Sequence, residues 1–330
     1  MVMGRGAGSK AISREEKRLK KEKEKRIREA NRMLIPVPKI TVASMKLLSF
    51  DPAGTFRFER DCWKRVYKVR NASGIGAGSF AKELKASVRI TTVIDSEGEE
   101  NTYMTLTENG ETYDEVRTYF SEDEEKVAKH MEISLCSIDE TMKAVNRNKE
   151  NFSYASMVRG KKDWKKECIA EVVEDVSSFR MEADFGETLF VMQYPETLKG
   201  DVVDKLRKMG CEIEIAYDLD SISTADQIDF GRTLEQKFNR RGKSDLEFLN
   251  SSFQIMFLCD SDDARAIVKK TIISILSAEC FVIAPSIGAQ KIAAESISSL
   301  GLLQLTYMRN VTVDVLDQIN VLGGREDGSN

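Results

Sequence analysis

A glycine-rich stretch, Gly74-Ile-Gly-Ala-Gly-Ser79, is the segment of this sequence whose spacing comes nearest to a phosphate-binding loop. A Walker loop needs four residues between its glycines and then a lysine that reaches the β and γ phosphates, and no lysine stands at that place. A dinucleotide fingerprint needs a further glycine two residues later, and Gly78 falls one position early. The stretch therefore predicts a flexible connection.

Histidine occurs once, as His130, so most chemistry that uses histidine as an acid, a base or a metal ligand is excluded. His130 comes at the end of a predicted helix, where we expect it to interact with the helix dipole. The cysteines are widely scattered, and none has the short paired spacing of a zinc site or a redox motif. We expect reduced thiols at Cys62, Cys136, Cys168, Cys211, Cys259 and Cys280.

Two acidic runs, Glu97-Gly-Glu-Glu100 and Glu122-Asp-Glu-Glu125, contain carboxylates that could hold a divalent cation. Neither run has the alternating oxygen ligands, central glycine and final glutamate of a calcium loop. The runs predict a solvated turn and a helix N-terminus that the helix dipole favours. Together with the scarcity of histidine, these patterns predict a chain that is not an enzyme and that has no catalytic residue, metal or cofactor.

Residues 1–38 are expected to form a basic helical or disordered arm, which Pro36 and Pro38 separate from the folded part. Good helix formers dominate the arm, and glutamates lie between its basic residues. We interpret the arm as a contact for anionic lipid or a protein partner, with nucleic acid and an inert charged helix as the alternatives. The contact residues would be Arg14, Lys17, Arg18, Lys20, Lys21, Lys25, Arg26 and Arg28.

A second basic cluster contains an aromatic residue among its charges. Such a combination can bind single-stranded nucleic acid through phosphate contacts and base stacking. The formal net charge of −4, from 50 Lys+Arg against 54 Asp+Glu, is not typical of a nucleic-acid binder, so a solvated loop is the favoured interpretation. Contact with nucleic acid would be made by Arg159, Lys161, Lys162, Trp164, Lys165 and Lys166.

The remaining chain is predicted to form two mixed domains, residues 39–175 and 176–330. The full length of 330 residues with 41% hydrophobic residues is enough for two buried cores. In the first domain, alternating apolar residues predict two short strands at 55–60 and 64–69 and a hairpin at 88–107. Apolar residues at helical spacing then predict helices that begin at Tyr113 and Ile138.

The second domain alternates strands and helices more clearly. Strands are predicted at 188–193, 211–217, 251–259 and 280–283, and helices at 198–209, 224–238 and 261–277. This order is similar to a ferredoxin-like or split βαβ layer, in which helices cover one face of a sheet. The predicted fold class is therefore α+β, with such layers in two domains and no exact sequence repeat between them.

The chain has no apolar stretch that approaches the roughly 18 residues needed to cross a bilayer. Its N-terminus begins with polar and basic residues and not with the apolar core of a signal peptide. We therefore expect a cytoplasmic protein, in which any membrane attachment is peripheral and at the inner face of the cell membrane.

The ordered pattern from about Phe56 to Val315 resembles the N-terminal region of the traffic ATPases of conjugation and type IV secretion systems, in particular the TraE/TrsE type. Three segments carry the resemblance: residues 101–120 with their strand and helix, Gly186-Glu-Thr-Leu-Phe-Val-Met-Gln-Tyr-Pro195, and Phe253-Gln-Ile-Met-Phe-Leu258 with the helix after it. Members of that family continue into a RecA-like motor domain with Walker motifs, which this sequence lacks. No ATPase residue of the family is therefore carried over.

The resemblance implies a structural or docking component of a machine that transfers DNA from a mobile genetic element. Its expected partners are protein subunits of that machine, including a membrane channel or a separate motor ATPase, and a homo-oligomer is compatible with this role. An anionic membrane surface is a further expected partner. A nucleic-acid-binding accessory protein that uses the two basic clusters is the alternative.

Overall fold

The computed structural model describes residues 47–51, 53–72, 75–145, 172–229, 232, 247–297, 300, 308–319 and 322. Contacts within the chain divide it into two compact units, residues 1–36 and 37–330, and all described residues lie in the second. These residues mix helices with a large antiparallel sheet, which confirms the predicted α+β class.

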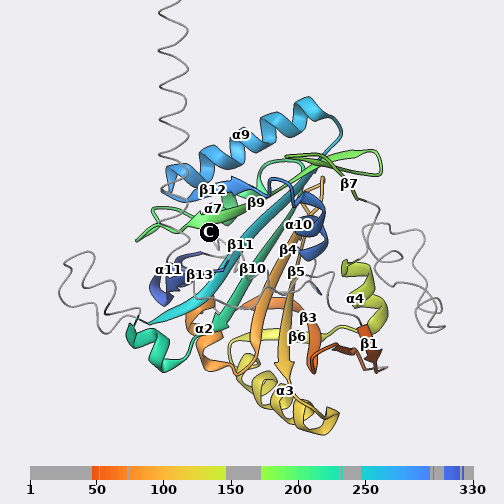
Figure 1. The fold of residues 1–330 in the computed structure, drawn as a ribbon, viewed down its shortest axis with the longest axis vertical. Helices are drawn as coiled ribbons and strands as arrows, with labels where there is room; N and C mark the ends of the chain where they lie inside the picture. Colours follow the sequence, from red (N-terminus) through yellow and green to blue (C-terminus); the bar gives the residue numbers. More distant parts are fainter. Residues whose placement is uncertain are drawn as a thin grey trace, which may run out of the picture. The chain divides into compact units, whose positions relative to one another are not determined.

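In the part of the chain that the structure describes, thirteen strands form one sheet (Figure 1). The strands are β1 (Leu47–Phe50), β2 (Thr55–Phe58), β3 (Cys62–Ala72), β4 (Ser87–Ile94), β5 (Glu100–Asn109), β6 (Met131–Leu135), β7 (Val172–Glu174), β8 (Phe179–Met181), β9 (Asp184–Gln193), β10 (Glu212–Ser221), β11 (Phe248–Cys259), β12 (Val282–Pro285) and β13 (Arg309–Thr312). The sheet order is β1-β2-β3-β5-β4-β10-β11-β9-β8-β7, and β6, β12 and β13 pair with β3, β9 and β11.

The helices connect these strands at both ends of the sheet. They are α2 (Ala77–Glu83), α3 (Tyr113–Val127), α4 (Ile138–Val145), α7 (Val202–Arg207), α9 (Asp262–Ala278), α10 (Gln290–Ser296) and α11 (Val313–Gln318). In residues 224–238, where one helix is predicted, residues 224–229 are helical, and Ser223 precedes them with its hydroxyl accepting the N–H of Asp226 at 3.2 Å. Of the remaining predicted residues, 230–238, all except residue 232 lie outside the described residues.

Two halves of the sheet have the same order of elements. The first half runs β3–α2–β4–β5–α3–β6 along the chain and has the strand order β6-β3-β5-β4. The second half runs β9–α7–β10–β11–α9–β12 and has the order β12-β9-β11-β10. The halves join where β4 pairs with β10, from Val88↔Leu219 to Ile94↔Ile213. The predicted ranges 39–175 and 176–330 thus contribute to one sheet, while the ferredoxin-like description stays a prediction.

Local sequence signals explain where the elements begin and turn. In the β4–β5 hairpin, the Asp95 carboxylate accepts the backbone N–H groups of Glu97 and Glu99, and Gly98 supplies a positive φ of 84°. This confirms the predicted turn. The side chains of Thr112 and Ser261 accept the N–H groups of Glu115 and Ala264 and so cap α3 and α9.

The two faces of the sheet carry different residues because strand side chains alternate. Ile213, Ile215 and Tyr217 of β10 face the core that α2, α3, α7, α9 and α11 cover. Ala216, on the opposite face, packs in a separate cluster with residues of β8, β11 and α10. Buried charges lie on both faces: Glu108 is on the helix-covered face, and Arg89 and Asp218 are on the opposite one.

Candidate functional site

An exposed apolar patch lies where the β7–β8 hairpin meets the start of α10. We define the apolar patch as Val176 and Ile287, which are 68% and 66% exposed. The N–H of Gly288 donates to the carbonyl oxygen of Val176 at 2.9 Å, so the turns that carry Val176 and Ile287 are adjacent. Figure 1 shows β7 and α10 close to each other at one end of the sheet, and the two elements are in contact.

Buried contacts fix the elements below the patch. The side-chain amide of Gln290, which is fully buried, accepts the N–H of Thr188 at 2.8 Å and donates to its carbonyl at 3.2 Å. Phe179 and Met181 of β8 pack with Ile297 in the cluster on this face of the sheet. A surface held in this way loses little conformational freedom when a partner binds to it.

A buried ion pair links the two halves of the sheet on the same face. Arg89 of β4 stands opposite Asp218 of β10, and its guanidinium donates to both carboxylate oxygens, at 2.6 and 3.0 Å. Arg89 also donates to the carbonyl of Ser296, at the end of α10, where helix carbonyls lack partners of their own. The two ionic side chains are 3% and 0% exposed, so this pair fastens three elements.

Lys64 of β3 is a second buried cation on this face. Its ammonium group donates to the carbonyl of Leu300 at 3.3 Å. Burial lowers the pKa of Lys64 to about 8, because the charged form loses its hydration. The lysine therefore secures the chain that follows α10.

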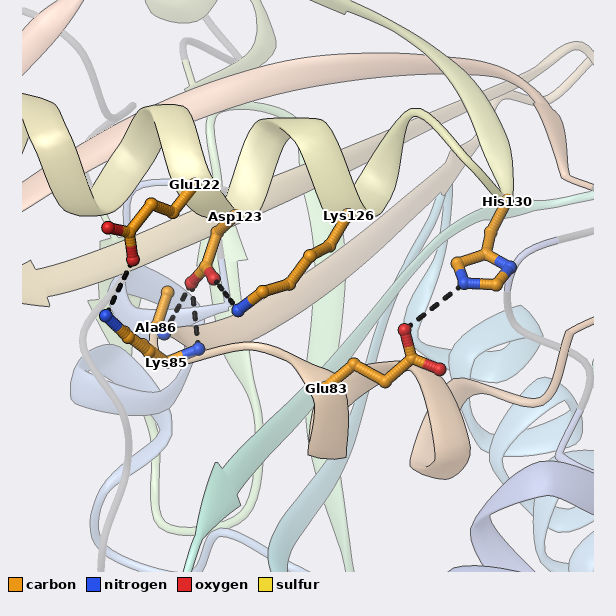
Figure 2. Close-up of polar contacts among 7 residues, drawn as sticks. All are labelled: Glu83, Lys85, Ala86, Glu122, Asp123, Lys126 and His130. Atoms are coloured by element: carbon orange, nitrogen blue, oxygen red, sulfur yellow. Dashed lines mark hydrogen bonds and ion pairs between the residues drawn. The ribbon is translucent and has the colours of Figure 1, made fainter.

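A buried carboxylate holds the connection between α2 and β4 (Figure 2). Asp123 of α3 is fully buried and accepts the backbone N–H groups of Lys85 and Ala86 at 2.9 and 2.8 Å, and the ammonium of Lys126 at 2.8 Å. The predicted solvated helix N-terminus is thus wrong for this acidic run, which lies inside α3. Its neighbour Glu122 is exposed and pairs with Lys85 at 2.6 Å, as a solvated residue would.

A second carboxylate, Glu108 of β5, interacts with Asp123. Glu108 is 7% exposed, and its Oε1 has no hydrogen-bond partner. The pKa of Glu108 is raised to about 7, mainly by burial and then by the charge of Asp123 and a hydrogen bond to it, while Lys85 and Lys126 act in the opposite direction. Glu108 can therefore gain or lose a proton near neutral pH.

His130 follows α3 and contacts α2. Its Nε2 lies 3.3 Å from Oε2 of Glu83 (Figure 2). Its ring packs edge-on against Phe80 at 6.4 Å between centroids. The backbone N–H of His130 donates to the carbonyl of Val127 at 2.9 Å, as part of the turn that ends α3. His130 therefore links two helices, and the predicted interaction with the helix dipole stays a prediction.

The glycine-rich stretch begins a helix, so the predicted flexible connection is wrong from Ala77 onward. The Asp317 carboxylate of α11 accepts the N–H of Ser79 at 2.7 Å and its hydroxyl at 2.5 Å. A Cβ on Gly76 would lie 2.1 Å from Cγ of Asp317, and one on Gly78 would lie 2.8 Å from Cβ of Leu316. The glycines thus let α11 approach α2, and a carboxylate of the protein occupies the helix start.

The residues predicted to contact lipid, a partner or nucleic acid all lie outside the described residues. They are Arg14, Lys17, Arg18, Lys20, Lys21, Lys25, Arg26 and Arg28 of the arm, and Arg159, Lys161, Lys162, Trp164, Lys165 and Lys166 of the second cluster. Among the residues that are described, no group of three or more His, Cys, Asp or Glu side chains is placed to hold a metal ion. No helix in this part has the length and apolar character needed to cross a membrane.

The described residues therefore offer buried charged groups that fasten elements to one another, and an exposed apolar patch that has no such internal role. Sequence reasoning missed the patch because Val176 and Ile287 are 111 positions apart in the chain. One signal was present: Val176 stands between the acidic pair Glu174-Asp175 and two serines. Neither a family model nor a curated protein matches the chain.

Proposed function

We propose that this chain is a non-catalytic docking component of a conjugation or type IV secretion machine. It binds a membrane channel or a separate motor ATPase on the cytoplasmic side. The observation that carries the proposal is the apolar patch on its fixed scaffold. The resemblance of the ordered elements to the N-terminal region of traffic ATPases indicates which kind of machine the chain would belong to.

The patch has the features of a protein contact. Single exposed aliphatic side chains are ordinary on protein surfaces, whereas two on adjacent turns offer an apolar surface that a partner can bury. Val176 and Ile287 meet this condition, because the hydrogen bond from Gly288 to Val176 joins their turns. Burying one such side chain against a partner contributes about 1.5–3 kcal/mol.

The test measures the affinity of the purified chain for the channel subunit and the motor subunit of the same transfer system, each by itself. Ile287→Asp is expected to raise the Kd for the bound subunit about tenfold or more, because about 1.4 kcal/mol of lost binding corresponds to tenfold. Ile267→Asp is the matched control: Ile267 is 64% exposed but lies on α9. It should leave the Kd unchanged.

Two results contradict this proposal. One is the absence of micromolar binding to either subunit. The other is an Ile287→Asp variant that binds as tightly as the unchanged chain while both variants remain folded by circular dichroism.

The basic arm is proposed to add a contact to anionic lipid or to the same protein partner. Co-sedimentation with vesicles of anionic lipid compares the full chain with a chain that begins at Pro36. Equal sedimentation of the full chain and the shortened chain would rule out a lipid contact by the arm. The nucleic-acid alternative predicts DNA binding that weakens steeply with salt and with charge reversal at Lys161, Lys162, Lys165 and Lys166. Salt-independent or absent binding discards it.

A further inference from the structure

Two cysteines lie at the same end of the β10–β11 pair. The antiparallel register pairs Ile213 with Phe257 and Glu212 with Leu258, so Cys211 and Cys259 are the next residues after the last pair. Both side chains belong to the apolar side of the sheet, where Cys259 is in the main core and Cys211 packs against it. Each thiol is near enough to the other to shift its pKa.

The spacing of such a pair suits a disulfide. Directly opposed residues of antiparallel strands have Cα atoms about 4.5–5.5 Å apart, which lies within the range that disulfides span. Their Cβ atoms are about 4.5–5.5 Å apart, so they must approach by up to about an ångström.

The chain before Cys211 has room for this approach. Cys211 precedes the first residue of β10, so it is not held by the strand itself. Gly210 has a φ of +68°, and no neighbouring atom lies within 4 Å of the position that a Cβ would take there. The chain beside Cys211 is therefore not tightly packed on the side where Gly210 would carry a Cβ.

We propose that Cys211 and Cys259 form a modification site, at which a small disulfide of the glutathione class converts the two thiols into an intramolecular disulfide. The thiolate of Cys211, which is less buried, attacks the oxidant, forms a mixed disulfide and releases one small thiol. The thiolate of Cys259 then attacks the sulfur of Cys211 and releases the second small thiol. The two cysteines lose two electrons and two protons, and the oxidant gains them.

The surroundings of Cys211 make the reaction slow at neutral pH. The pKa of Cys211 is raised to about 12, mainly by burial and then by its neighbours Cys259 and Glu212. Only the thiolate attacks a disulfide, so the rate should rise about tenfold for each pH unit below this pKa.

The surroundings of Cys259 act mainly in the same direction. Burial raises its pKa, and the charges of Asp260 and Asp184 add to this effect, whereas Cys211 and Arg265 lower the pKa. The pair thus responds to sustained oxidation and stays reduced during brief exposure. Once formed, the bond would join the start of β10 to the end of β11, two residues before the cap of α9.

The test uses the full chain with Cys168→Ser and Cys280→Ser, because these changes remove an exposed thiol and one outside the described residues. After incubation with oxidised glutathione at about pH 8.5, the intact mass should fall by about 2 Da, for the two lost hydrogens. Peptide mapping should recover a Cys211–Cys259 cross-link that dithiothreitol reverses. The cross-linked protein should also melt at a higher Tm.

The control adds Cys211→Ser to the same background and should show no mass loss. Three results overturn the proposal: the same loss of mass in this control, a lasting glutathione adduct on Cys211 without a cross-link, or a native chain that keeps both thiols while the urea-unfolded chain is oxidised.

Discussion

Replacing Asp123 by alanine should destabilise the protein, because its carboxylate holds three donors in the core. Two of these are the backbone N–H groups of Lys85 and Ala86, at 2.9 and 2.8 Å. A buried donor that loses its partner costs about 1–3 kcal/mol, so the two N–H groups together cost about 2–6 kcal/mol. The Lys126 side chain is 29% exposed and can turn to solvent, so the loss of its ion pair adds little. The loss of the Asp123 charge also makes it easier for Glu108 to ionise, which reduces the destabilisation by about 1 kcal/mol. We expect a net loss of about 1–5 kcal/mol of unfolding free energy at pH 7.

Urea unfolding followed by circular dichroism measures this loss. Asp123→Asn keeps an oxygen that can accept one N–H, so it should cost about half as much as Asp123→Ala. Glu125→Ala is the control, because Glu125 is exposed on the same helix and should change stability by less than about 0.5 kcal/mol. If Asp123→Ala falls within this control range, the carboxylate does not hold the α2–β4 connection and the reasoning is refuted.

Three further predictions concern Glu108, Arg89 and Gly76. Because the folded-state pKa of Glu108 is about 7, its protonation favours the folded state below that pH, and stability should fall as the pH rises from about 5 to about 8. Urea unfolding at several pH values should show that Glu108→Gln reduces this dependence of the unfolding free energy on pH. An unchanged dependence would mean that another group causes it. Arg89→Ala should cost about 3–5 kcal/mol, and the double variant with Asp218→Ala should cost clearly less than the sum of the single changes, since strict additivity would mean that the ions do not interact. Gly76→Ala should lower the Tm, because the added Cβ would clash with Asp317. Gly200→Ala is the control and should be tolerated, because its Cβ would meet only the flexible ends of side chains, at 3.3 Å or more. Equal Tm values for the two variants would show that α11 can move away from Gly76.

Sequence periodicity predicted those elements whose residues alternate over a long run. The β4–β5 hairpin, β11 and α9 fall where apolar spacing and capping residues place them, with Ser261 at the start of α9. The strands β7 and β8 have three residues each and α11 has six, and such short elements carry too little pattern to be recognised. These elements exist because the sheet beside them is already formed.

The pairing of the strands was harder to predict from the sequence than the strands themselves. Alternation shows which residues of a strand share a face, but it does not identify the neighbouring strand. The sequence therefore predicted two domains on either side of residue 175, although β4 and β10 come from the two ranges and pair over seven positions. Residues Val88 and Leu219 at one end of this pairing are 131 positions apart.

The candidate site shows the same limit. Asp123 and Glu122 are neighbours in an acidic run, yet one is fully buried and the other exposed. Asp123 accepts the backbone N–H groups of the α2–β4 connection, whereas Glu122 contacts the exposed ammonium of Lys85. An acidic run at helical spacing predicts a solvated face, and it does not show which carboxylate meets backbone donors from another element. The patch residues Val176 and Ile287 are likewise brought together by a turn contact that no local pattern contains.

The Arg89–Asp218 pair explains how two such distant strands could find one register. A slip of one residue would place Arg89 opposite Tyr217 or Leu219 and leave two buried charges without partners. A buried ion pair contributes little to stability compared with apolar side chains of the same size, so its value here lies in the penalty on wrong pairings. We infer that the pair selects the register at which the halves join. Replacing both residues by leucine should then keep most of the stability but admit shifted pairings, visible as doubled amide signals of β4 and β10 in NMR spectra; a single set of signals would contradict the inference.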